Sequence, residues 1–213
     1  MEYEKTIKEA EELAKILIKK KARKSFGIYY FTWGFYYLYV ILISEILSYL
    51  NVTNVIIGSL PYFAFVIPLY YTYRMVRDIN WEFIVQRHRI ENLEKAKKQY
   101  TKELAISYVI ITIIFTLIFY VIVPLSTSEI VRLVAVSLFV IFILYWLYKA
   151  LYSANRFVDP KYYDHLAVIS FPFLTPVMAG LLPSIMTFSI SMLVAMAWLY
   201  AGFISILEVS EIE

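Results

Sequence analysis

Long apolar runs alternate along this chain with short charged segments. Four of the runs are close to the roughly 20 residues that cross a bilayer core as a helix. They cover residues 27–50, 52–73, 103–123 and 130–152. A last run, 166–207, has 42 residues without a charge, which is about 63 Å of helix and about twice the core thickness. Two helices joined by a turn near Gly180–Pro183 explain that length, so we predict an all-α polytopic membrane protein with six transmembrane helices in three hairpins.

Two of the polar segments also have a helical pattern. In 1–26, apolar residues recur at spacings of four and three, which places them on one stripe of a helix: Tyr3, Ile7, Ala10, Ala14 and Leu17. A similar stripe marks 74–102. We therefore expect two cytoplasmic amphipathic helices, which could pair within one chain, pair across a dimer, lie on the bilayer or dock a partner. Pairing between copies or within the chain is favoured over partner docking.

The complete predicted layout has seven segments. They are a cytoplasmic amphipathic helix 1–26, hairpin 27–73, a cytoplasmic helical linker 74–102, hairpin 103–152, a cytoplasmic loop 153–165, hairpin 166–207 and an acidic cytoplasmic tail 208–213. No Gly-xxx-Gly pattern marks a close helix contact.

Lysines and arginines support this layout. Residues 1–26 hold eight of them, 74–103 hold eight and 149–165 hold three, so 19 of the 20 fall on one face if the chain crosses six times. The positive-inside rule makes that face cytoplasmic. We predict a multi-pass protein of the cell membrane with both termini in the cytoplasm.

Composition narrows the possibilities further. The absence of cysteine excludes disulfides and thiolate metal sites. Asn and Gln total only seven, a bias that suits a thermophile or an AT-rich genome. The first 24 residues are densely charged, unlike a secretory signal peptide, so the first apolar run is expected to stay as a membrane helix.

Glu45 is the most informative single residue, because an ionisable group at membrane depth is costly and usually pairs or lines a watery cavity. Arg132 is the only basic residue predicted on the outer side. The functional interpretation is a proton or cation site on Glu45, gated by Arg132. The favoured alternative is a structural ion pair or a carboxylate that reaches the headgroups. Glu129 competes for Arg132 at a helical spacing of three.

Prolines occupy two of the predicted transmembrane helices: Pro61 and Pro68 in the second, and Pro172 and Pro176 in the fifth. They could mark the broken helices of a transporter. Kinks satisfied by neighbouring helices are the favoured interpretation. The fifth segment should be short and interrupted, with a re-entrant segment as the alternative.

No motif indicates catalysis. The chain has no nucleophile elbow, zinc-protease helix or phosphate-binding loop. His88, Asp159, Asp164 and His165 could be metal ligands, but their spacing supports no site, and Asp164 is better explained as a helix cap. We expect no enzyme activity, no cofactor and no metal.

The basic residues before the first apolar run are candidates for contact with anionic lipid headgroups: Lys19, Lys20, Lys21, Arg23 and Lys24. Glutamates interleave the lysines, which argues against nucleic acid as a partner. The expected partners are membrane lipids and either a second copy or another membrane subunit. The leading hypothesis is a non-catalytic membrane subunit of a transport or export assembly. The alternative is a small ion- or proton-coupled transporter or channel that uses Glu45.

Overall fold

The structure is a computed structural model that describes residues 2–51, 64–87, 93–153 and 159–210. Every regular element in those ranges is a helix, as predicted for the fold class. In chain order they are α1 (Glu2–Tyr49), α3 (Val66–Arg87), α4 (Leu93–Thr116), the π-helix η1 (Leu117–Ile122), α5 (Val123–Leu125), α6 (Glu129–Ser153), α7 (Tyr162–Ser170), the 3-10 helix η3 (Phe171–Phe173), α8 (Leu174–Met178) and α9 (Ser184–Ser210).

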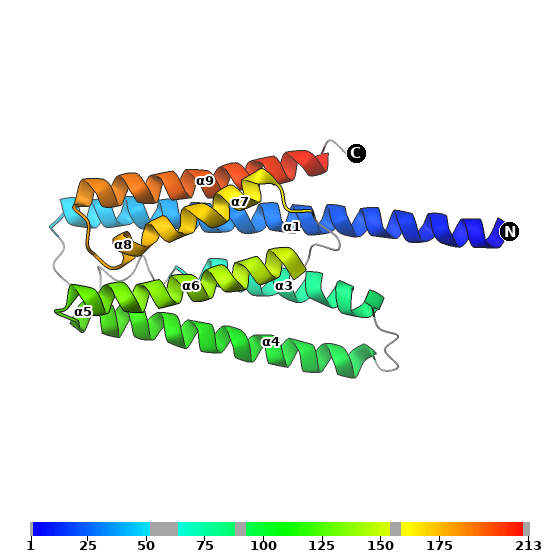
Figure 1. Cartoon of the computed structure of the whole chain (residues 1–213), viewed down its shortest axis with the longest axis horizontal. Coiled ribbons are helices and arrows are strands. Elements are labelled where there is room, and N and C mark those ends of the chain that lie inside the picture. The colour runs from blue at the N-terminus through cyan, green and yellow to red at the C-terminus, as the bar shows by residue number, and fades with distance from the viewer. Residues whose placement is uncertain (1, 52–63, 88–92, 154–158, 211–213) are drawn as a thin grey trace.

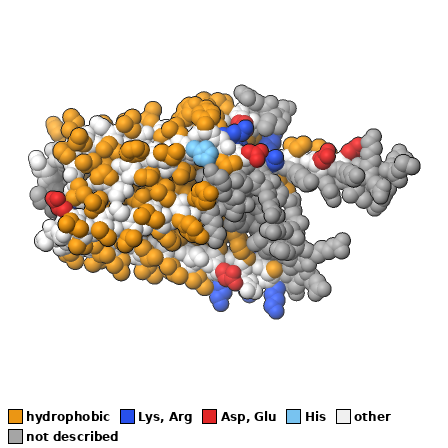
Figure 2. All heavy atoms as spheres, in the orientation of Figure 1, with side chains coloured by type: hydrophobic (Ala, Val, Ile, Leu, Met, Phe, Trp, Pro, Cys, Tyr) orange, Lys and Arg blue, Asp and Glu red, His pale blue; other side chains and the backbone are white. Residues whose placement is uncertain are grey.

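The surface of the helical bundle is largely apolar. Hydrophobic side chains cover most of the face shown in Figure 2, and charged side chains gather near the end from which α1 projects. Within the described ranges, three helical segments are long and apolar enough to cross a membrane: Glu12–Tyr49, Glu94–Leu125 and Ser184–Ser210. These observations fit a membrane protein, whereas the count of six transmembrane helices stays a prediction.

The expected boundary between a cytoplasmic helix and the first transmembrane helix does not exist as a break. α1 runs through it without interruption for 48 residues and projects past the ends of its neighbours (Figure 1). No proline interrupts this stretch, so each backbone N–H keeps its helical acceptor. The two predicted segments are therefore one rigid element.

The predicted helix over 74–102 is wrong as a single helix. The Tyr100 hydroxyl donates to the Val76 carbonyl at 3.5 Å, although a straight helix would hold these residues about 36 Å apart. The chain therefore reverses direction between α3 and α4, which lie side by side (Figure 1). The polar linker consists of the ends of two longer helices and the connection between them.

α1 and α9 make the most extensive contact between helices in the described bundle. Glycines allow it: a Cβ on Gly202 would lie 3.0 Å from the Phe31 backbone nitrogen, and one on Gly27 would lie 2.7 Å from Ile206. Gly34 meets Leu199 in the same way. Small residues that permit close backbone approach are a common device in membrane helix packing. Sequence analysis missed this contact because its glycines are seven residues apart or on different helices.

The fifth apolar segment is broken, as predicted. α7 ends at Ser170, Pro172 lies in η3, and α8 has only five residues. The turn predicted near Gly180–Pro183 also exists, because α9 begins at Ser184 and Gly180 has a φ of +65°, which favours glycine. This short, bent segment packs between α6 and α9.

Candidate functional site

A buried ion pair lies where α1, α7 and α9 meet. Arg23 Nη1 donates to both carboxylate oxygens of Asp164, at 3.0 and 2.7 Å. The Tyr30 hydroxyl donates to the same carboxylate at 2.7 Å. Arg23 is 5% exposed and Asp164 is 1% exposed. The pair is therefore closed to solvent and to any substrate.

Glu208 of α9 forms the outer side of this cluster. Its carboxylate lies 3.4 Å from Arg23 Nε and 3.7 Å from Lys161 Nζ, and it accepts a short hydrogen bond from the Tyr163 hydroxyl. Burial, followed by this hydrogen bond, raises the pKa of Tyr163 above its ordinary range. We call Arg23, Tyr30, Tyr163, Asp164 and Glu208 the polar cluster.

Local sequence explains why Asp164 is available to Arg23. Asp164 is the third residue of α7, where a carboxylate caps the helix by accepting from backbone N–H groups. It accepts from the Lys161 N–H at 2.8 Å, so the capping role predicted from sequence is present. Arg23 Nη2 also donates to the Asp159 carbonyl at 3.0 Å. The cluster thus ties the start of α7 to α1.

Arg23 departs from the headgroup position predicted for it. It is the only arginine in the first 73 residues, and its guanidinium holds three nitrogens in one plane, so that Nη1, Nη2 and Nε reach Asp164, Asp159 and Glu208 at once. That single arginine among lysines was the available signal. Of the other predicted headgroup residues, Lys19, Lys21 and Lys24 are exposed and Lys20 is partly buried. Lys19 lies 4.0 Å from Asp159.

A second feature is a cavity of about 680 Å³ within the bundle. It is lined from α1, α3, α4, η1–α5, α6, η3–α8 and α9. Thirteen of its 29 lining residues are aromatic, and Glu45 is the only one with a formal charge. Cavities of this size commonly hold small molecules.

The inner wall of the cavity centres on Trp198. Its ring lies 5.7 Å from those of Tyr29 and Tyr37 and 5.8 Å from that of Tyr30. Trp198 is 1% exposed, and its indole N–H has no hydrogen-bond acceptor among the described residues. A buried donor in that state costs about 1–3 kcal/mol. A bound molecule with an acceptor would relieve this cost.

The π-helix η1 shapes another wall. It follows α4 directly and supplies Phe119 and Tyr120 to the cavity lining. π-helical turns are rare and occur frequently at functional sites. Phe119 lies 4.6 Å from Phe115, which stacks at 4.1 Å on Phe65 of the neighbouring segment. These rings form a continuous aromatic wall.

Glu45 and Arg132 are not brought together. Glu45 lines the cavity four residues before the end of α1 and is exposed. Arg132 is in the first turn of α6. Its guanidinium reaches the turn after α8, where a Cβ added to Gly180 would lie 3.5 Å from Arg132 Nη1. Among the described residues, no ion pair joins Arg132 to Glu45 or to Glu129. The ion pair considered for Glu45 and Arg132 is therefore absent between these two described residues, and the place of Glu45 in the cavity lining is new from the structure.

Among the described residues, none of the other predicted helix-break or metal-ligand positions lines the cavity. Pro61 and His88 lie outside the described residues. Pro68 is buried in the first turn of α3, where its missing N–H removes no helical hydrogen bond. Its carbonyl accepts from the Thr72 hydroxyl at 2.7 Å. Pro176 is within α8. In the described part of the chain, no group of three or more His, Asp or Glu could hold a metal.

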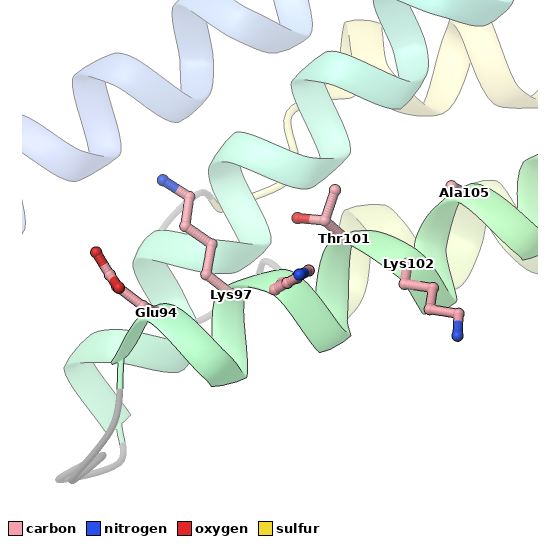
Figure 3. A pocket seen from close by; sticks show the side chains of 6 residues that line it. Glu94, Lys97, Thr101, Lys102 and Ala105 are labelled. Carbon is pink, nitrogen blue, oxygen red and sulfur yellow. The ribbon is translucent and has the colours of Figure 1, made fainter.

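A shallow hollow lies on the surface of α4. Its lining residues are Glu94, Lys97, Lys98, Thr101, Lys102 and Ala105, all on one helix (Figure 3). The side chains fan outward and do not converge on a common point (Figure 3). The hollow is a basic surface strip at the start of α4, and we do not assign it a ligand.

No known protein family, curated protein or solved structure matches this chain.

Proposed function

We propose that this protein is a non-catalytic membrane subunit of a transport or export assembly, and that it assembles with a second copy of itself through the projecting half of α1. The observation that carries the proposal is the exposed apolar face of that projection. Leu13 and Leu17 are 62% and 65% exposed. The helix also carries many charges there, which places it in water and leaves the apolar face uncovered.

Pairing within one chain does not cover this face. The reversal between α3 and α4 removes the single linker helix that would have been its partner. Two copies in one membrane would both present α1 in the same direction, so a pair of projections would be parallel. The interval from Tyr3 to Leu17 then provides the two heptads of a short coiled coil.

Charge placement supports a parallel, in-register pair. With Tyr3, Ala10 and Leu17 at d positions, Thr6, Leu13 and Lys20 take the g positions. The e positions that they face on the other copy are Glu11, Ile18 and Ser25. No like charges oppose one another at these g and e positions, and Leu13 faces an apolar residue. Lys21 takes the next a position and would face its own copy, so the pairing is confined to Tyr3–Leu17. Two heptads are marginal alone, but anchoring both helices in one membrane raises their effective concentration.

The test is the mass of the detergent-solubilised protein, measured by light scattering. We expect a dimer for the unmodified chain and a monomer for Leu13→Glu/Leu17→Glu. The matched control is Glu9→Ala/Glu12→Ala, which alters exposed residues away from the stripe and should stay dimeric. A monomeric unmodified chain, or a dimer that survives the double glutamate variant, contradicts the proposal.

A second candidate function is transport by the chain itself, and the position of Glu45 on the cavity wall favours it. An ionisable group beside a cavity inside a membrane bundle is a common element of ion pathways. Proton or cation flux into reconstituted vesicles should then fall when Glu45 is replaced by Gln. Flux that is absent, or equal in both proteins, contradicts this candidate.

A further inference from the structure

The cavity has the electrostatic character of a site for a cation. Glu45 is the only charged residue in its lining, and no Lys, Arg or His lines it. Within the described residues, the Glu45 carboxylate has no hydrogen bond or ion pair. The negative charge of the cavity is therefore uncompensated by the protein, and a ligand that entered would be favoured if it were positive.

The walls favour a particular kind of cation. Aromatic faces attract organic cations through the ring quadrupole, and sets of such rings recognise quaternary ammonium groups. The side chains nearest to Glu45 along α1 include Tyr37 and Ile41 of the lining. Deeper in, the lining is formed mainly by rings and aliphatic side chains. Apart from Glu45, the side-chain oxygens of the lining are neutral Ser, Thr and Tyr hydroxyls. An inorganic cation would exchange its hydration for these and for apolar wall, so the lining favours an organic cation.

The length of the cavity limits the shape of a ligand that would fit it. Along α1 its lining runs from Tyr29 to Glu45, about 24 Å at the helical rise. A volume of about 680 Å³ spread along that length suits an elongated ligand better than a compact one. The charge lies at one end of this space and Trp198 toward the other.

We propose that the cavity binds a single-tailed amphiphilic organic cation. Its positively charged nitrogen lies against the Glu45 carboxylate, and its apolar body runs between the aromatic walls toward Trp198. This proposal does not rest on assembly through α1, because every residue that it uses comes from one copy. Binding without flux would also satisfy it, so it stands apart from the transporter candidate.

A dodecyltrimethylammonium with a bromine on its terminal carbon is a suitable probe, because it carries its charge at one end and, at the other, a bromine that quenches tryptophan fluorescence on contact. The chain has four tryptophans, of which Trp33 and Trp198 line the cavity. In a Trp81→Phe/Trp146→Phe background only these two report. The protein would be titrated in nanodiscs of phosphatidylcholine. We expect saturable quenching, with a Kd about tenfold higher for Glu45→Gln, since one lost charge contact of about 1.4 kcal/mol corresponds to that factor.

Three variants make the result specific. Glu45→Asp keeps the charge and should retain binding within about threefold. Glu129→Gln removes an exposed carboxylate that does not line the cavity and should not change the Kd. Ser191→Leu fills the cavity beside Trp198 and should abolish saturable quenching. Helical circular dichroism and an unchanged elution volume establish that each variant is folded.

Several outcomes overturn the proposal. Quenching that stays linear with probe concentration, as simple partitioning into lipid would give, removes the site. A Kd equal for Glu45→Gln and the unmodified protein removes the role of the charge. Displacement of the probe by neutral 1-phenyldodecane as readily as by dodecyltrimethylammonium shows that the cavity selects an apolar body alone.

Discussion

The polar cluster and the cavity share α1 and α9, but they differ in how completely their polar groups are satisfied. In the cluster, Asp164 accepts four hydrogen bonds, and Arg23 is paired with two carboxylates and a carbonyl. In the cavity, Glu45 and the Trp198 indole have no partner among the described residues. A satisfied buried network rigidifies a fold, whereas unsatisfied groups around a cavity are available to a ligand. We therefore assign structure to the first region and function to the second.

The sharpest way to break this comparison is to remove one partner of the buried pair. Arg23→Met leaves Asp164 as an uncompensated buried carboxylate, and such a change typically costs about 3–5 kcal/mol. We expect a loss of that order in the unfolding free energy, measured by denaturant titration in mixed micelles. The double variant Arg23→Met/Asp164→Leu removes both charges and should recover part of the loss. If Arg23→Met alone is neutral, the cluster is not the clamp described here.

The contact between α1 and α9 tests whether the cluster depends on helix packing. A side chain at Gly202 would meet backbone atoms of α1 at 3.0 Å, which cannot move aside, so the helices must separate. Gly202→Leu should cost about 1–3 kcal/mol through overpacking. It should also weaken the contact between Glu208 and Arg23. Met196→Leu, on the exposed face of α9, is the control and should leave stability unchanged.

Glu208 tests the outer side of the cluster. Its side chain is 33% exposed, so solvent screens its charge, and pairs of this kind contribute about 1 kcal/mol or less. Glu208→Gln should therefore lower stability far less than Arg23→Met. The small loss caused by Glu208→Gln should become smaller still at high salt. A loss as large as that of Arg23→Met would place the main anchor on α9 instead of α7.

The fold was predictable wherever the local sequence of a helix determines its length and its ends. Apolar runs and the prolines at 172 and 176 indicated long helices and a broken fifth segment, because length and ring geometry act locally. The reversal between α3 and α4 was missed because charged residues continue the helical pattern up to the turn. The pairing of Arg23 with Asp164 spans 141 residues, and no local pattern specifies such a contact. Glu45 was recognisable by its cost in a membrane, but its surroundings depend on six other segments.

The smallest expected effect on stability is a gain, whereas substitutions in the polar cluster should cause losses. Ser191 is buried beside the cavity, and its replacement by Leu adds apolar contacts to a space that the protein leaves open. Filling a cavity commonly stabilises a protein, and we expect a gain of about 0.5 kcal/mol in unfolding free energy. Every substitution in the polar cluster should instead destabilise. If Ser191→Leu destabilises as strongly as Gly202→Leu, the space beside Trp198 is too small for the added side chain, and the site proposed there would be lost. A small gain accompanied by loss of binding of the brominated ammonium probe is the result that a functional cavity requires, because a protein keeps unfilled space at a cost in stability when a ligand uses it.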